Sequence, residues 1–200
     1  MSSLAVIIAA IVLFVLLAAI LVSIYNKLVS LRARFENSFA QIEVQLTRRY
    51  DLIPNLLETA KAYLKHESET LLAVTAARNT AVESLKAAAA KPGDPAAIAA
   101  LNQAEQNLSG GLAGLRIQLE AYPEIKANTV LMQFSEELTS TENRVAFARQ
   151  AFNDAVTAYN IQRKTFPTVL VAAAFGHPQD AALLEFANKD AIQAAPKVSF

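Results

Sequence analysis

The sequence has no cysteine, only five glycines and no excess of charge of either sign. The lack of cysteine and of a glycine-rich phosphate-binding loop argues against an enzyme. The lack of cysteine also fits a reducing compartment, without excluding an oxidising one. The 18 Lys and Arg residues balance the 18 Asp and Glu residues. This balance argues against a nucleic-acid partner, because phosphate contacts need a basic face.

Residues 4–24 form one apolar run, LAVIIAAIVLFVLLAAILVSI, without a charge, glycine or proline. At about 1.5 Å per residue, a helix of this length spans roughly 31 Å, the thickness of a bilayer core. A signal peptide would have a basic start and a shorter apolar run, but residues 1–3 carry no basic side chain. We therefore expect residues 1–24 to be an uncleaved transmembrane anchor in the lipid bilayer.

Small residues recur within this run. Ala5 and Ala9, and then Ala19 and Ser23, are four positions apart, a spacing that allows close approach of two helices in lipid. We expect these residues to pack between copies of the chain in a homo-oligomer.

The charges beside the span predict its orientation. Lys27, Arg32 and Arg34 follow it, and no basic residue precedes it. The positive-inside rule then places the N-terminus outside and the following domain in the cytoplasm. In the alternative, the domain is periplasmic and these side chains extend to anionic headgroups.

No proline or glycine precedes Pro54, so the anchor is expected to continue as one helix without a hinge. Because proline cannot continue the helical hydrogen bonds, a turn is predicted between Tyr50 and Pro54, with Asp51 as its cap and Asn55 following. The alternative is that Asp51, Pro54 and Asn55 form a partner-binding site. Apolar residues at helical spacing predict the buried face of this first helix: Leu28, Leu31, Phe35, Ile42, Leu46 and Ile53.

Three further amphipathic helices are predicted. The second starts near Leu56 and ends in KAAAAKPGDP, where Asp94 and Pro95 predict the start of the third. The fourth follows Pro123 and runs to about Phe166. The predicted fold is therefore all-α: an N-terminal transmembrane helix continuous with an antiparallel up-and-down four-helix bundle of long helices, residues 25–166. An apolar segment and a flexible tail, residues 167–200, complete the chain. Residues 168–175, TVLVAAAF, are too short to span a bilayer. They are expected to pack in the interior or, in the alternative, to dock at the membrane surface, because the fourth helix should end near it.

Polar residues beside the apolar stripes predict a structural network. Glu142, Arg149, Asn153 and Asn160 lie within about 40° of one another on the fourth helix and should be partly buried. If the first and fourth helices are antiparallel, Arg49 lies opposite Glu142 and Glu43 lies almost opposite Arg149. Such pairing would fix how the two helices align, because a buried charge needs a partner.

A second group of polar residues lies on the opposite side of the first helix. Asn26, Asn37 and Arg48 recur every 11 residues there. They predict either a solvated face or an interaction face for another protomer or partner.

Neither histidine predicts a metal site. His66 and His177 lack the glutamate three positions earlier that a di-iron bundle would need. No metal or cofactor is expected.

Several blocks of the sequence, in order, resemble the LemA family of bacterial membrane proteins. They are YNKLVSLRARFENSFAQIEVQL, RRYDLIPNL, EAYPEIKAN and TENRVAFARQAFNDAVTAYN. The resemblance runs from Tyr25 to about Phe186, with small departures at residues 60–63 and at Phe152 and Asn153. It implies an N-terminal membrane helix and an extended four-helix bundle, and it implies no chemistry, because the family has no established activity.

These observations predict a single-pass protein of the bacterial inner membrane. The expected function is a self-associating scaffold or protein-interaction module, without catalytic activity, for protein partners that the sequence does not identify. One alternative is a periplasmic module in envelope stress or protein quality control. Another, from a different class, is a hydrolase or metal enzyme.

Overall fold

The structure, a computed structural model, describes residues 3–64, 67–121 and 129–185. His66 and residues 186–200, which include the tail APKVSF that is predicted to be flexible, lie outside these ranges. The described residues form helices and turns without a strand, which confirms the predicted all-α class. The helices are α1 (Ser3–Lys61), α2 (Ser68–Ala90), α3 (Pro95–Ala121), α5 (Thr129–Lys164) and the short 3-10 helix η1 (Thr168–Leu170).

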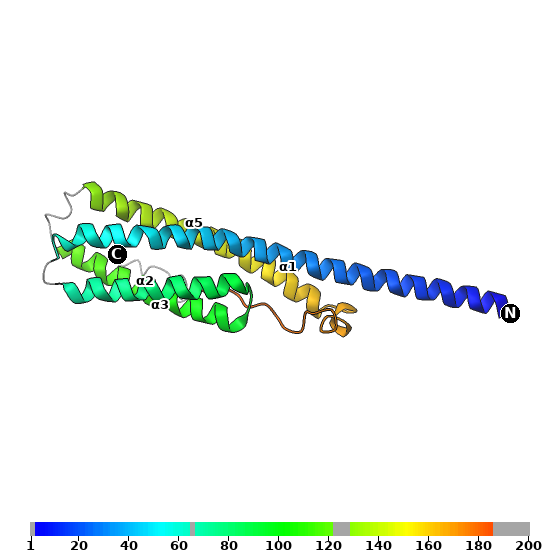
Figure 1. Cartoon of the computed structure of the whole chain (residues 1–200). Coiled ribbons are helices and arrows are strands. Elements are labelled where there is room, and N and C mark those ends of the chain that lie inside the picture. Colours follow the sequence, from blue (N-terminus) through cyan, green and yellow to red (C-terminus); the bar gives the residue numbers. More distant parts are fainter. Residues whose placement is uncertain (1–2, 65–66, 122–128, 186–200) are drawn as a thin grey trace, which may run out of the picture.

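The long helices run up and down in one bundle (Figure 1). α1 packs against α5 and α2, and α2 packs against α3. Successive helices run in opposite directions along the molecule (Figure 1). The predicted antiparallel bundle is therefore confirmed.

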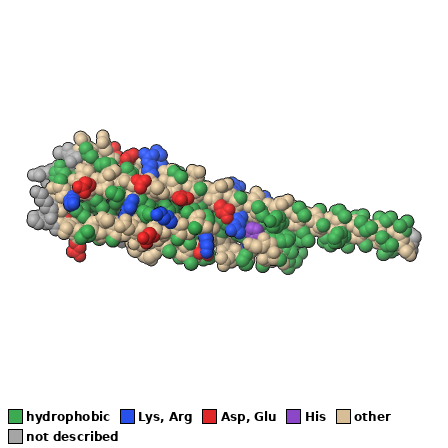
Figure 2. All heavy atoms as spheres, in the orientation of Figure 1, with side chains coloured by type: hydrophobic (Ala, Val, Ile, Leu, Met, Phe, Trp, Pro, Cys, Tyr) green, Lys and Arg blue, Asp and Glu red, His purple; other side chains and the backbone are tan. Residues whose placement is uncertain are grey.

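α1 is a single helix of 59 residues, roughly 88 Å long at 1.5 Å per residue. Its N-terminal part projects alone beyond the bundle (Figure 1), and its side chains are exposed and almost all apolar (Figure 2). By length and composition this part is a candidate membrane span. Burial begins at Ile24, and the helix continues into the bundle without a break, as predicted.

The core lies along the inner faces of the helices. All six residues of the predicted α1 stripe are buried. Near the projecting helix, aromatic rings join α1 to α5: Phe39 and Phe152 have ring centroids 5.4 Å apart, and Phe35 and Tyr159 have centroids 5.2 Å apart. Edge contacts of this kind add to the stabilisation from buried apolar area.

The predicted turn at Asp51, Pro54 and Asn55 is wrong, because α1 continues through Pro54 to Lys61. Proline has no N–H, so the carbonyl of Tyr50 loses its usual helical donor. Arg78 of α2 takes that place and donates from Nε to the Tyr50 carbonyl oxygen at 3.1 Å. The same guanidinium of Arg78 forms an ion pair with Asp51 at 3.8 Å. A side chain from a neighbouring helix thus satisfies the backbone group that proline leaves free.

The predicted start of the second helix is also wrong, because α2 begins at Ser68 rather than near Leu56. Leu56 and Ala60 belong to the last turns of α1 and are buried. Leu46, Tyr50, Ile53, Leu56 and Ala60 follow one another at intervals of three or four residues. The apolar stripe of α1 therefore continues past Pro54 without a break.

The turn between α2 and α3 has the predicted cap. The carboxylate of Asp94 accepts a hydrogen bond from the Ala97 N–H at 2.9 Å. Gly93 has φ 84°, and a Cβ there would lie 3.0 Å from the Cβ of Ala181 and 3.1 Å from the Phe35 ring. Glycine is therefore required both by the backbone and by the close approach of the C-terminal chain.

Candidate functional site: a buried polar network, a strap and an open groove

A cluster of polar side chains lies in the interior where α1, α3 and α5 meet. Arg49 donates to the Glu105 carboxylate of α3 at 2.8 Å, and both side chains are buried. The Tyr50 phenol donates to the other oxygen of Glu105 at 2.5 Å. Arg49 also donates to Ser109 at 3.3 Å and to Glu142 of α5 at 3.5 Å. One buried arginine therefore connects three helices.

Burial shifts the ionisation of this cluster. It raises the pKa of the Glu105 carboxyl above its ordinary value, while the charge of Arg49 and the hydrogen bond from Tyr50 oppose that rise. Burial and the neighbouring Glu105 charge also raise the pKa of Tyr50, so the phenol keeps the proton that it donates. Because an unpaired buried charge costs several kcal/mol, Arg49 and Glu105 depend on each other.

The predicted contact between Arg49 and Glu142 is present. Arg49 does contact Glu142, but Glu142 is exposed rather than partly buried, because it lies at the rim of the cluster. Glu43 is exposed and Arg149 is half-buried, and their pairing stays a prediction. The principal partner, Glu105, was missed. Its signal is visible in the sequence, since it occupies a position of the α3 apolar stripe between Leu101 and Leu108.

Asn153 and Asn160 are half-buried as predicted, but they bind a different part of the chain. Each side chain forms two hydrogen bonds with the backbone of the C-terminal strap, residues 177–185. Asn153 bonds the N–H and C=O of Leu184 at 2.9 and 3.1 Å. Asn160 bonds the N–H and C=O of Ala181, both at 2.9 Å. The strap therefore runs antiparallel to α5.

Further contacts fasten the strap to the bundle. The Ala182 N–H donates to the Gly93 carbonyl in the α2–α3 turn at 2.9 Å, so the strap bridges that turn to α5. Arg163 donates to the Asp180 carboxylate at 2.8 Å, and Lys164 also pairs with Asp180. Burial would raise the pKa of Asp180, but these cations outweigh it and lower that pKa.

The start of the strap is held by a ring pair in the interior. The Tyr159 hydroxyl lies 3.0 Å from Nδ1 of His177. Burial and the charge of Arg32 lower the pKa of His177, so the neutral ring is favoured in this contact.

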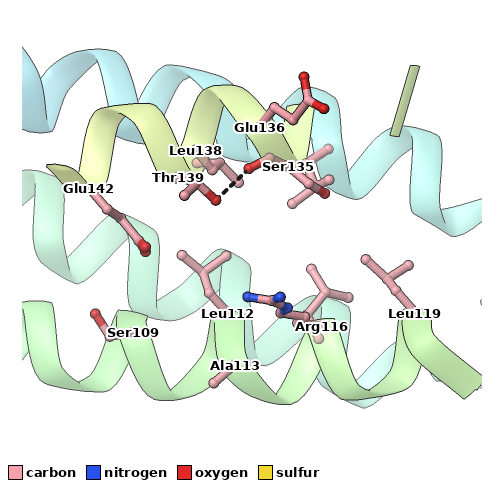
Figure 3. A pocket seen from close by; sticks show the side chains of 12 residues that line it. Ser109, Leu112, Ala113, Arg116, Leu119, Ser135, Glu136, Leu138, Thr139 and Glu142 are labelled. Carbon is pink, nitrogen blue, oxygen red and sulfur yellow. Dashed lines mark hydrogen bonds between the residues drawn. The ribbon is translucent and has the colours of Figure 1, made fainter. Parts of the chain in front are cut away.

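A groove separates α3 from α5 at the end of the bundle farthest from the projecting helix. It consists of a cleft of about 530 Å³ and a second hollow of about 270 Å³ that share Arg116, Leu119, Ser135 and Glu136. In Figure 3, Leu112 and Leu119 point from α3 toward α5, Arg116 lies along α3, and Glu142 reaches from α5 toward α3. Such a surface suits apolar side chains with polar groups at their edges. The lining of the cleft is completed by Leu56, Ser109, Ala113, Leu115, Leu138 and Thr139.

The other predicted site residues lie on the outside of α1. Asn26 and Asn37 are exposed, as are Ala5, Ala9, Ala19 and Ser23 in the candidate span. Arg48 forms an exposed ion pair with Glu137 of α5 at 2.9 Å, so it already has a partner within the chain. Contact of these residues with another protomer stays a prediction.

The described part of the chain contains no cluster of three or more His, Cys, Asp or Glu residues placed to hold a metal ion. This finding does not decide whether the protein needs a metal or cofactor. The expectation that it uses none stays a prediction.

Comparison with known proteins identifies the family. The sequence model of the LemA family matches residues 38–200. The chain belongs to the LemA family. Protein LemA of Metamycoplasma hominis is 25% identical over 147 residues, which are 74% of this chain and 63% of that relative. The match thus spans less than two thirds of that LemA protein. The family match includes the polar network, the strap and the groove, and it supports the resemblance stated from the sequence blocks.

Proposed function

We propose that this LemA-family chain is a membrane-anchored protein-interaction module without catalytic activity. In this proposal α1 anchors the bundle, and the α3–α5 groove binds an apolar polypeptide segment of a partner protein. The groove is the observation that supports the proposal, because the half-buried Leu112 and Leu119 line an open cleft between two helices.

The strap supports a polypeptide as the occupant of the groove. Near the projecting helix, an extended segment of the chain itself lies between α5 and the α2–α3 turn. Leu184 and Ala181 of that segment are buried. The same two-layer arrangement of α5 and the α2–α3 pair continues to the far end, where the gap is left open as the groove. A second extended segment with apolar side chains is therefore the natural occupant.

The candidate span supports membrane anchorage. An exposed apolar helix of this length cannot remain stable in water, because it would leave a large apolar area solvated. The basic residues that follow the span, Lys27, Arg32 and Arg34, favour a cytoplasmic bundle in the inner membrane. A reporter fused after Phe200 that functions only in the cytoplasm should be active, and activity of a periplasmic reporter alone would reverse this orientation.

Site-specific crosslinking tests the groove. A photoreactive residue replaces Leu112 in the full-length protein, and a control places the same residue at Leu72, which is 69% exposed on α2 and outside the groove. The expected result is a discrete protein product from position 112 in cells, absent from position 72. The captured protein, once purified, should bind the wild-type chain and should lose that binding when Leu119→Glu is introduced into the groove.

Two outcomes would contradict the proposal. A product formed equally from both positions would show general surface contact. A product joining position 112 only to the chain's own residues would show that the groove is filled internally rather than by a partner.

Self-association also belongs to the proposed function. If copies pack through the small residues of the span, Ala9→Phe and Ala19→Phe should lower the oligomer size of the full chain in mild detergent, measured by light scattering. Leu13→Phe is the matched control, because it changes a position in the same span that is already large. A monomeric wild-type protein at micromolar concentration would end this part of the proposal.

A further inference from the structure

The chain turns sharply after α5 and presents large apolar side chains outward. We call residues 166–175 the apolar turn. Phe166, Val169 and Leu170 are 75%, 51% and 72% exposed, respectively. Three such side chains within five positions form an exposed apolar surface of the kind that marks an interaction site.

The apolar turn is held in a defined shape. Thr168 and Ala172 are buried beneath it. The Gln162 amide donates to the Thr168 hydroxyl at 2.9 Å, and the Ala172 N–H donates to the Thr168 carbonyl at 2.9 Å. The outward direction of the apolar side chains is therefore fixed by packing and hydrogen bonds on the inner side of the turn.

The position of the turn identifies what it meets. The ring of Phe175 packs edge-on against Tyr25, with centroids 5.6 Å apart. Tyr25 follows the candidate span directly, so the turn lies beside α1 where that helix leaves the bundle (Figure 1). In Figure 2 the apolar surface of the projecting helix continues onto this end of the bundle. If the span is inserted, the turn lies at the level of the lipid headgroups.

We propose that the apolar turn is a second membrane contact, which inserts Phe166, Val169 and Leu170 at the boundary between headgroups and acyl chains. This inference rests on the proposed anchorage through α1, and it adds a docking surface that anchorage alone does not require. Aromatic and aliphatic side chains are stable at this depth, and tyrosine is enriched there. Two attachments, the span and the turn, then fix how the bundle is rotated about the axis of α1.

The absence of cysteine makes a direct test possible. Single cysteines replace Leu170, Leu13 in the span, and Leu72, which is as exposed as Leu170 but lies on α2. Each full-length variant carries a fluorescent label and is reconstituted in vesicles of phosphatidylcholine and phosphatidylglycerol. Quenching by brominated acyl chains reports membrane contact, and quenching by iodide reports contact with water. Labels at 13 and 170 should be quenched by the lipid and shielded from iodide, and the label at 72 should show the reverse.

The three positions separate the two proposals. A label at 13 that is open to iodide would overturn the anchorage. The docking of the turn alone would be overturned by a different result. In that result the label at 13 is shielded, but iodide quenches the label at 170 as strongly as the label at 72. If the Leu170→Cys variant does not fold, judged by circular dichroism, Phe166→Cys takes its place with the same expected result.

A second substitution tests the apolar contact itself. Adding Val169→Asp to the Leu170→Cys variant should restore iodide quenching severalfold, because a carboxylate at the acyl boundary is unfavourable. Val44→Asp, at a valine of α1 within the bundle that is 59% exposed against 51% for Val169, should leave the label shielded. Equal effects of the two aspartates would contradict specific insertion.

Discussion

The two ends of the bundle use the same helices but are filled differently. Near the span, aromatic rings join α1 to α5, and the strap occupies the space between α5 and the α2–α3 turn. At the far end, α3 and α5 face each other across the groove, whose larger cleft is about 530 Å³. The helices alone therefore do not close the bundle. An added segment packs at one end and leaves a hollow of about 270 Å³ beside it, whereas no segment of the described chain occupies the larger groove at the other end.

The Arg49 cluster lies between these two ends. It ties α1 to α3 and α5 beside the residues that line the groove, since Ser109 and Glu142 belong to both. The cluster therefore keeps the groove walls in place without filling the groove.

Of the substitutions considered, the loss of Arg49 should lower the free energy of unfolding the most. Arg49→Met leaves Glu105 buried without its charge partner, and we expect a loss of about 3–5 kcal/mol in the free energy of unfolding. Urea unfolding of the full chain in mild detergent, followed by circular dichroism, measures it. Arg49→Met combined with Glu105→Leu should recover much of the loss, and a double variant no more stable than Arg49→Met would contradict the assignment.

The same variant has an expected pH dependence. Burial raises the folded-state pKa of Glu105 above its ordinary 4.5, and removing Arg49 removes an opposing effect. A folded carboxyl with a raised pKa contributes stability at low pH that is lost as pH rises through that pKa. The difference between Arg49→Met and the wild type should therefore be greater at about pH 8 than at about pH 5. A difference independent of pH would show that Glu105 is not the affected group.

Release of the strap should come next. Asn153→Ala removes both hydrogen bonds to Leu184, and we expect a loss of about 1–3 kcal/mol, with faster amide hydrogen exchange at residues 181–184. Asn143→Ala, at an exposed asparagine of α5, serves as control and should change stability by less than about 0.5 kcal/mol. Unchanged amide hydrogen exchange at Leu184 would show that the hydrogen bonds of Asn153 do not hold the strap in place.

The Pro54 contact should have a moderate effect that depends on the proline. Arg78→Met leaves the Tyr50 carbonyl without a donor and should cost about 1–2 kcal/mol. In a Pro54→Ala background the new N–H supplies that donor, so the same change should cost less, with a coupling energy of about 1 kcal/mol. Additive effects of the two substitutions would contradict the proposed compensation.

A groove substitution should have the smallest effect on folding. Leu119→Ala removes a half-buried side chain that has an open cleft on one side, so we expect a loss of no more than about 1 kcal/mol. Leu28→Ala, at a fully buried position near the span, should cost about 2–5 kcal/mol. Similar losses at the two positions, measured by the same urea unfolding, would show that the far end is as closely packed as the near end.

The sequence predicted what depends on one helix or on one pair of helices. The α1 stripe, its continuity with the span and the alignment of Arg49 with Glu142 follow from helical spacing and antiparallel packing, and the structure contains all three. Pro54 was misread because its effect depends on Arg78, which comes from another helix. The partners of Asn153 and Asn160 were not predicted, because residues 181–184 have no periodic pattern that would place them beside α5.

The unbroken α1 also acts as a spacer of fixed length. From Tyr25, at the end of the span, to Leu56, in the wall of the groove, the helix rises about 47 Å. The helix is unbroken over this distance and continues through Pro54. If α1 is inserted and the groove binds a partner as proposed, that partner must present its segment at this distance from the bilayer, so its reach would matter as well as its side chains.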